Sequence, residues 1–418
     1  MALLSPNRLS RLWRRLAAVL LITALGSTLV STGQAQPTSS RAVALAETVE
    51  SRAVFVDSLL SMMTLEEKLG QLAQTPSQWS DTGPTVPSGG KSAIREGRVG
   101  SFLSLYGAEA TRDMQRIAVE ESRLGIPLLF AYDVVHGYRT IFPIPLAEAS
   151  SFHPDLARRT ARASAMEATA GGVHWTFSPM VDVTRDPRWG RIMEGAGEDP
   201  YLNSVFARDR VHGYQTATPQ ANLSADTTLL STAKHFVAYG AAQAGRDYNP
   251  ADVSDRTVHE IFLPPFHAAA EAGVRSVMPG FNDLGSVPMH AHNDLIDGLL
   301  RDRWDWDGLV VSDYTAVWEL IHHGVAQDSV DAGVQALEAG VDVDMVSSIY
   351  VDTLAPAVRS GRLYEQEVNE AVRRVLRAKW DLGLFHDPYR YGSPQAEEEV
   401  ILSDAHRDLA HEAVRYDT

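Results

Sequence analysis

The segment LARRTARASAMEATAGGVHWTF, residues 156–177, places a helix, a glycine stop and a strand in one run of sequence. Residues 156–170 are rich in alanine, the residue that helices favour most. The glycines at 171 and 172 suit a helix end, because glycine adopts left-handed backbone angles without a steric cost. The mostly apolar run 173–177 then has the length of a buried strand, so the segment predicts one helix–strand unit.

The same order of helix pattern, glycine and short apolar run recurs along the chain. The further units are 110–118, Gly125 and 128–131; 258–272, Gly273 and 274–278; 295–300, Gly308 and 309–311; and 334–339, Gly340 and 341. A late amphipathic helix is marked by apolar residues at 368, 371, 372, 375 and 376. Apolar strands that alternate with helices indicate a parallel sheet with helices on both faces.

The fold that we expect is α/β, a TIM-type (β/α)8-like barrel. At least six strands over a chain of this length favour a barrel. The competing fold is an open doubly wound sheet, which binds dinucleotides at a glycine-rich turn after its first strand. The sequence has no GxGxxG turn and no phosphate-loop lysine motif at such a place. We therefore expect no cofactor.

The composition of the 418 residues removes other classes of protein. With no cysteine, the chain has no disulfide, cysteine nucleophile, thiolate zinc site or iron–sulfur cluster. A net charge of −16 disfavours nucleic acid and anionic membrane surfaces as partners. His290 with His292 and His322 with His323 form close pairs, but neither pair has a matched third ligand. We expect these histidines to be surface or supporting residues, and we expect no metal site.

The N-terminus has the layout of a secretory signal peptide over residues 1–35. Arginines at 8, 11, 14 and 15 precede the apolar stretch 16–30, and Gly33 and Ala35 are small residues that suit a signal peptidase. The alternative is a membrane anchor, but the apolar stretch is short and interrupted at 26–28. We expect a periplasmic or secreted protein without membrane contact after signal removal, with a tether at 36–45 and a barrel domain at 46–390.

Charged residues stand at the ends of the predicted strands. They are Asp133, Lys234 with His235, Asp313, and Asp342 with Asp344. In a barrel the carboxyl ends of all strands surround one mouth, so several of these side chains would converge there. The loop 185–195 adds arginine, carboxylate and tryptophan side chains. Such a set suits a sugar, because hydroxyl pairs form bidentate hydrogen bonds and the apolar face of a pyranose packs on aromatic rings.

Five motifs in a fixed order carry a resemblance to a known family. They are MTLEEK at 63–68, YDVVHG at 132–137, DPRWGR at 186–191 followed by Glu194-Gly195, AKHF at 233–236 and VSDY at 311–314. Over residues 64–389 the sequence resembles the catalytic barrel of glycoside hydrolase family 3, and within that family the periplasmic β-glucosidases. The resemblance implies a retaining, exo-acting β-glucosidase that hydrolyses terminal non-reducing β-D-glucosyl residues.

The resemblance also implies roles for individual residues. Asp313 stands at the position of the nucleophile that forms the glycosyl-enzyme. The sugar hydroxyls would be held by Asp133, Arg191, Lys234 and His235, and the pocket would be lined by Met278, Phe281 and Tyr314. Phe281 stands where relatives often have tyrosine, and Tyr314 where many have tryptophan or histidine, so contacts to the substrate could differ. Asp342 and Asp344 are interpreted as structural residues.

The proton donor is the unassigned part of the implied mechanism. In two-domain relatives it is a glutamate of a second α/β domain. By the same resemblance, residues 391–418 are a linker and the start of a truncated second domain, so we expect no acid/base residue in this chain. A missing second domain or a homo-oligomer would then be its partner.

Two alternative functions remain open. The first is a sugar-binding barrel with weak or no turnover, because the acid/base is missing. The second is a single-domain β-N-acetylhexosaminidase, which in this family uses a histidine soon after the Lys-His-Phe strand. No histidine occurs between His235 and His259, which disfavours this alternative.

Overall fold

The computed structural model describes residues 41–48, 51–80, 83–215, 223 and 225–416. The predicted signal peptide, residues 1–35, and the first half of the predicted tether lie outside these residues. Residues 41–45 of the tether begin helix α2 (Arg41–Thr48). In the described part of the chain, no helix combines the length and the apolar character needed to cross a bilayer.

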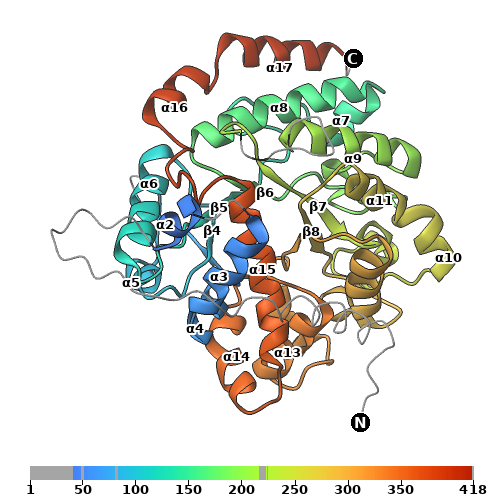
Figure 1. The fold of residues 1–418 in the computed structure, drawn as a ribbon. Coiled ribbons are helices and arrows are strands. Elements are labelled where there is room, and N and C mark those ends of the chain that lie inside the picture. The colour runs from blue at the N-terminus through green and yellow to red at the C-terminus, as the bar shows by residue number, and fades with distance from the viewer. Residues whose placement is uncertain (1–40, 49–50, 81–82, 216–222, 224, 417–418) are drawn as a thin grey trace, which may run out of the picture. The chain divides into compact units, whose positions relative to one another are not determined.

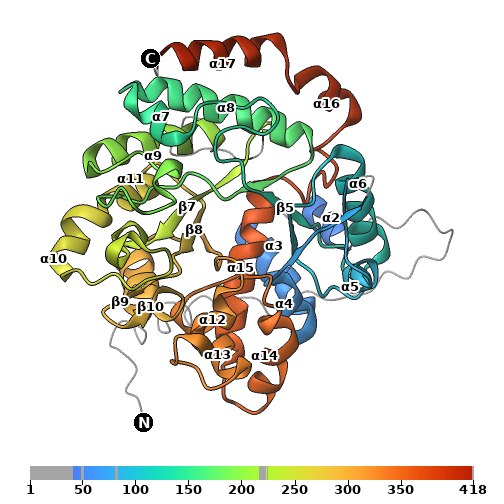
Figure 2. The ribbon, with the colours of Figure 1, turned by 180° about the vertical axis from the view of Figure 1, so that it is seen from behind.

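Within the described residues, eight strands form one sheet whose order follows the chain. They are β1 (Ala73–Pro76), β4 (Ser101–Leu103), β5 (Leu129–Tyr132), β6 (Trp175–Thr176), β7 (Leu230–Phe236), β8 (Ser276–Pro279), β11 (Leu309–Val310) and β12 (Asp344–Met345). Neighbours from β1 to β11 pair in parallel, and Ala73 of β1 pairs with Asp344 of β12. A parallel bridge between Val311 and Val343 joins β11 to β12. The ring is thereby closed, and the expected TIM-type barrel is confirmed (Figures 1 and 2).

Helices surround the strands and connect them (Figure 1). The α-helices among them are α3 (Arg52–Met62), α4 (Leu65–Gln71), α5 (Gly90–Arg95), α6 (Ala108–Arg116), α7 (Pro145–Ser150), α8 (Pro154–Ala170), α9 (Pro200–Gln215), α10 (Asp255–Thr257), α11 (Pro264–Glu271), α12 (Ala316–His322), α13 (Ser329–Ala339), α14 (Ile349–Arg359) and α15 (Glu365–Asp381). Between β8 and β11 the main helix is the π-helical η8 (Asp294–Arg303). The segment 391–418, interpreted as a linker and a domain start, contains α16 (Pro394–Val400) and α17 (Asp404–Tyr416). Both pack against α8 (Figure 1).

A buried carboxylate on α8 ties the C-terminal helices to the loop after β5. Glu167 accepts hydrogen bonds from Arg139 N, Thr140 N and Thr140 Oγ1 over 3.0, 2.8 and 2.6 Å. It also accepts from Leu402 N over 2.9 Å, and its Oε1 lies 3.0 Å from His406 Nδ1. Burial alone would raise the pKa of Glu167, but His406 and Thr140 outweigh burial and hold the pKa at about 2.

The join between β11 and β12 contains a buried ion cluster. Asp342 accepts from Arg301 Nη2, Arg374 Nη1 and Val310 N, each over 2.8 Å. The side chains of Asp342 and Arg301 are 1% and 3% exposed, so the charges are out of water. Asp344 accepts from the backbone N–H of Tyr350 over 3.2 Å. These contacts agree with the structural roles expected for both aspartates.

Candidate active site

The parallel order of the strands brings four of the predicted side chains to one end of the barrel. Asp133 follows β5, Lys234 and His235 lie in the last part of β7, and Asp313 follows β11. One hydrogen bond and one close approach connect them across the mouth. Lys234 Nζ lies 3.0 Å from Asp133 Oδ1, and His235 Nε2 lies 3.7 Å from Asp313 Oδ2. Residues 180 positions apart in the chain, such as Asp133 and Asp313, therefore share one site.

Asp313 is held by its own backbone turn and remains open on one side. Its Oδ1 accepts from Tyr314 N over 2.7 Å. Its Oδ2 is buried and has no hydrogen-bond partner among the described residues. Burial raises the pKa of Asp313 to about 6, although the Lys234 charge and the Tyr314 N–H act to lower it. The backbone is fixed to the segment directly before β12, because Ser312 N donates to Val343 O over 2.8 Å.

Two cationic side chains of the site are each paired with a carboxylate. The Lys234 side chain is 5% exposed, whereas the Asp133 side chain that it contacts is 51% exposed. Arg191 donates to Glu194 through Nε over 2.7 Å and through Nη2 over 3.0 Å. Its guanidinium carbon also lies 5.7 Å from the centre of the Tyr239 ring. A bidentate pair fixes the plane of the Arg191 guanidinium, which leaves its other donors in a defined direction.

The predicted pocket-lining residues differ in exposure. Met278 and Phe281 are buried, and Met278 on β8 pairs in register with Lys234 on β7. Phe281 packs against Tyr239 and Tyr248, with ring centres 5.9 and 4.5 Å apart. Tyr314 is half exposed beside Asp313. The rings around Asp313 thus offer apolar planes of the kind that pack on a pyranose.

Asp182 supports His235 and was missed in the sequence. Its Oδ2 lies 2.9 Å from His235 N and 2.8 Å from His235 Nδ1. Burial raises the pKa of Asp182 to about 7, and burial holds the pKa of His235 well below its usual range. A neutral His235 that donates from Nδ1 to Asp182 presents an acceptor at Nε2, on the side of Asp313. The available signal was an aspartate inside the apolar run 180–183.

His290 supports the backbone of Asp313. Its Nε2 accepts from Asp313 N over 3.0 Å, and the residue is 3% exposed. Burial lowers the pKa of His290 to about 3, so the ring is neutral and can accept. The sequence predicts that His290 and His292 are surface or supporting residues, because their H-x-H pair lacks a third ligand, but it does not show what His290 supports. In the described residues, no group of three or more histidine, aspartate or glutamate side chains is placed to hold a metal ion.

The structure is a closed (β/α)8 barrel whose mouth carries carboxylates, a lysine, a guanidinium and aromatic rings. These groups suit a polyhydroxylated ligand, so the class of protein is a barrel that binds such ligands. The comparison with protein families narrows this class. The model of the glycosyl hydrolase family 3 N-terminal domain matches residues 64–378. The chain belongs to this family.

Individual relatives agree with the family assignment. The chain is 42% identical over 375 residues to a periplasmic beta-glucosidase of Salmonella typhimurium, covering 88% of this chain and 48% of the relative. It is 35% identical over 325 residues to a beta-xylosidase of Formosa agariphila, covering 73% and 44% of the two chains. A crystal structure of beta-glucosidase from Listeria innocua in complex with isofagomine superposes with a TM-score of 0.80 at 40% identity, covering 87% and 50%. The chain spans about half the length of these relatives.

Proposed function

We propose that this chain is a retaining, exo-acting β-glucosidase in which Asp313 is the nucleophile. The observation that carries the proposal is the pair of buried, unpartnered acceptors Asp313 Oδ2 and His235 Nε2, which lie 3.7 Å apart among the described residues. An acceptor pair of this kind calls for a ligand that donates hydrogen bonds, such as a sugar hydroxyl. The names of the Salmonella and Listeria relatives support a glucosidase.

The proposed reaction is a double displacement. The Asp313 carboxylate attacks the anomeric carbon while the bond to the aglycone oxygen breaks, and that oxygen takes up a proton from a general acid or from solvent. Water then attacks the anomeric carbon of the glycosyl-enzyme, loses a proton to a base and releases Asp313 and the sugar with net retention. Lys234 and Arg191 stabilise the ionised form of Asp313 through their charge. Asp133, Arg191, Lys234 and His235 hold the sugar hydroxyls, while Met278, Phe281 and Tyr314 pack around the ring.

The proposal also places the chain in the periplasm. The arginines before the apolar stretch 16–30 have the pattern of a secretory signal. The Salmonella relative is named a periplasmic enzyme. Expression in a Gram-negative host followed by osmotic shock should release the mature chain, starting at residue 36 by N-terminal sequencing. Retention of residues 1–35 in the mature chain would contradict the signal assignment.

A trapped intermediate tests the nucleophile directly. A 2-deoxy-2-fluoro-β-D-glucosyl fluoride reacts at the nucleophile, and the fluorine slows hydrolysis of the ester that forms. We expect one sugar adduct by mass spectrometry, on the peptide that contains Asp313. Asp313→Ala should give no adduct, with Asp344→Asn as a control that changes another buried aspartate. An adduct on a different residue would refute the assignment.

Leaving groups and sugars test the remaining parts. The glucoside of 2,4-dinitrophenol scarcely needs a proton donor, whereas cellobiose needs one. The ratio of the two rates measures how much acid help this chain provides. The matching xyloside tests the sugar, because β-xylosidases are among the relatives. Glucose binding with no turnover of any of these substrates would support a sugar-binding barrel in place of an enzyme.

A further inference from the structure

The loop after β5 carries Asp133, and side chains hold its backbone where no neighbouring strand continues. Val134 N donates to Thr176 Oγ1 over 3.1 Å. Val134 O accepts from Tyr214 OH over 2.7 Å, and both residues are buried. The first peptide units after Asp133 are therefore fixed by two hydroxyl groups from β6 and α9.

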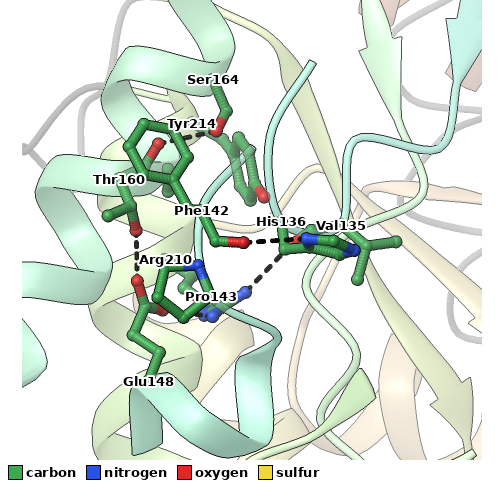
Figure 3. A pocket seen from close by; sticks show the side chains of 10 residues that line it. Val135, His136, Phe142, Pro143, Glu148, Thr160, Ser164, Arg210 and Tyr214 are labelled. Atoms are coloured by element: carbon green, nitrogen blue, oxygen red, sulfur yellow. Dashed lines mark hydrogen bonds and ion pairs between the residues drawn. The ribbon is translucent and has the colours of Figure 1, made fainter. Parts of the chain in front are cut away.

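Arg210 holds the next carbonyl of the loop, and a buried carboxylate holds Arg210 (Figure 3). Arg210 Nη1 donates to Val135 O over 3.2 Å, and Nη2 pairs with Glu148 Oε2. Thr160 Oγ1 donates to Glu148 Oε1 over 2.5 Å. The side chains of Glu148 and Arg210 are 1% and 8% exposed. A guanidinium bonded on two sides and removed from water has little freedom to move.

The two supporting side chains come from one face of one helix. Arg210 and Tyr214 are four residues apart on α9, so they lie above one another on the same side. Figure 3 shows both side chains beside the loop at Val135 and His136. Helix α9 packs against α8 and α11, so its position is fixed and its side chains can hold the loop in place.

We propose that Tyr214 and Arg210 are positioning residues for Asp133. The Asp133 side chain is 51% exposed, and its Oδ1 accepts a hydrogen bond from Lys234 Nζ over 3.0 Å. Because half of the side chain faces solvent, packing does little to orient it. Its direction depends on the backbone that follows it, and Tyr214 and Arg210 fix that backbone. This inference rests on the proposed function, since it assumes that Asp133 binds a sugar hydroxyl.

A double-mutant cycle on D-glucose binding tests the proposal. Tyr214→Phe removes one buried hydroxyl donor and keeps the ring. Val134 O then lacks its hydrogen-bond donor, so we expect the loop that carries Asp133 to shift. We expect glucose to bind about tenfold more weakly, a loss of the size that one buried hydrogen bond gives. The loss should vanish when Asp133 is already Ala, because no side chain is left to displace. Fluorescence titration gives the four dissociation constants of the cycle. Thermal unfolding checks that each variant is folded.

Tyr350→Phe is the matched control for Tyr214→Phe. The Tyr350 hydroxyl also donates to a buried carbonyl, Val341 O, over 2.9 Å, but ahead of β12 at the other end of the strands. We expect it to change unfolding and to leave the glucose dissociation constant unchanged. Weakening by Tyr214→Phe of equal size in both backgrounds, or no weakening at all, would overturn the inference. Unchanged binding in Asp133→Ala alone would overturn the proposed function first, and the inference with it.

Discussion

The environment of Asp313 both opposes and favours its charge, which sets the pH at which the proposed nucleophile works. Burial raises the pKa to about 6, and the Lys234 charge lowers it in part. Only the ionised carboxylate attacks, so activity is lost as pH falls through the pKa. The protonated, inactive form of Asp313 accumulates below about pH 6, and the ionised, active form accumulates above it.

We therefore expect kcat/KM for 2,4-dinitrophenyl β-D-glucoside to fall tenfold per pH unit below about pH 6. This substrate scarcely needs a proton donor, so the profile reports the nucleophile alone. Initial rates between pH 4 and pH 9 in one mixed buffer would measure it. An acid limb near pH 4, the usual range of an exposed aspartate, would contradict the burial effect.

Asp182→Ala should shift that acid limb to lower pH. Asp182 Oδ2 accepts from both His235 N and His235 Nδ1, so an asparagine oxygen can keep both bonds, whereas alanine removes the acceptor. The ring proton is then free to move to Nε2, where it can bond to Asp313 and stabilise the carboxylate. We expect kcat/KM to fall about 10- to 100-fold, the range found for partners that orient ligating histidines. The control is Asp344→Ala, a second buried aspartate that does not touch His235. A limb that moves equally in both variants would argue against orientation of His235.

Site residues at strand ends could be predicted from the sequence, whereas the residues that support them could not. Asp133, Lys234, His235 and Asp313 stand at the ends of apolar runs, and parallel pairing is sufficient to bring them to one mouth. Asp182 and His290 act through contacts that link residues 53 and 23 positions apart. Their side chains serve the backbone and ring of other site residues, which no local pattern encodes.

Helix α8 holds the C-terminal helices through the buried side chain of Glu167. Glu167 on α8 has a folded-state pKa of about 2, below its unfolded value of 4.5. Its ionised form therefore contributes stability above about pH 4.5, and this contribution is lost as pH falls toward 2. Of the residues that it bonds, Leu402 lies just before α17 and His406 lies in its first turn.

Glu167→Gln should loosen the attachment of α17. The amide carries no charge for Thr140 and His406, and its NH2 faces backbone donors, so we expect a loss on the order of 2 kcal/mol at pH 7. Hydrogen exchange should show faster exchange in 404–416 than in the wild type. The difference in unfolding free energy should shrink as pH is lowered to 3. Unchanged exchange in α17 would show that its apolar packing is sufficient.

Element prediction succeeded where helix and strand patterns were long, and failed for reasons that the structure explains. β1 holds the buried polar residue Gln74 and ends in a proline, and β4 has three residues, so neither forms a visible apolar run. The helix expected at 258–272 is a π-helical turn, 258–262, followed by α11. Pro264 and Pro265 lack the N–H that a continuous helix requires, so the regular segment restarts there.

At the scale of the whole molecule, the barrel is closed at β11 and β12, which have two residues each. The Asp342 cluster with Arg301 and Arg374 supplies side-chain bonds where the ladder is short. Removal of one partner of a buried ion cluster leaves uncompensated charge and costs about 3–5 kcal/mol. The fold class was predictable from alternating patterns, whereas this closing cluster joins residues far apart in the chain.

Asp342→Asn should therefore lower the free energy of unfolding by about 3–5 kcal/mol. At temperatures where the variant is folded, KM for the aryl glucoside should stay that of the wild type, because Asp342 lies outside the mouth. Urea unfolding and steady-state kinetics measure the two effects. Glu66→Gln, which breaks an exposed pair with Arg359, is the control and should change neither. A raised KM with normal stability would assign Asp342 to the site instead.

The attachment of the Asp313 turn to β12 determines when during synthesis the site can exist. Strands β1 to β11 can join the sheet one after another as the ribosome delivers them. The peptide units around Asp313 bond to Val343 O, directly before β12, and to Met345 O in β12, the strand delivered last. A nascent barrel can thus hold much of the proposed sugar pocket while the proposed nucleophile is still unplaced. Chemical competence should arrive in a single late event, when the ring closes, and pulse-labelled chains arrested before residue 345 should be inert toward the fluoro-sugar label.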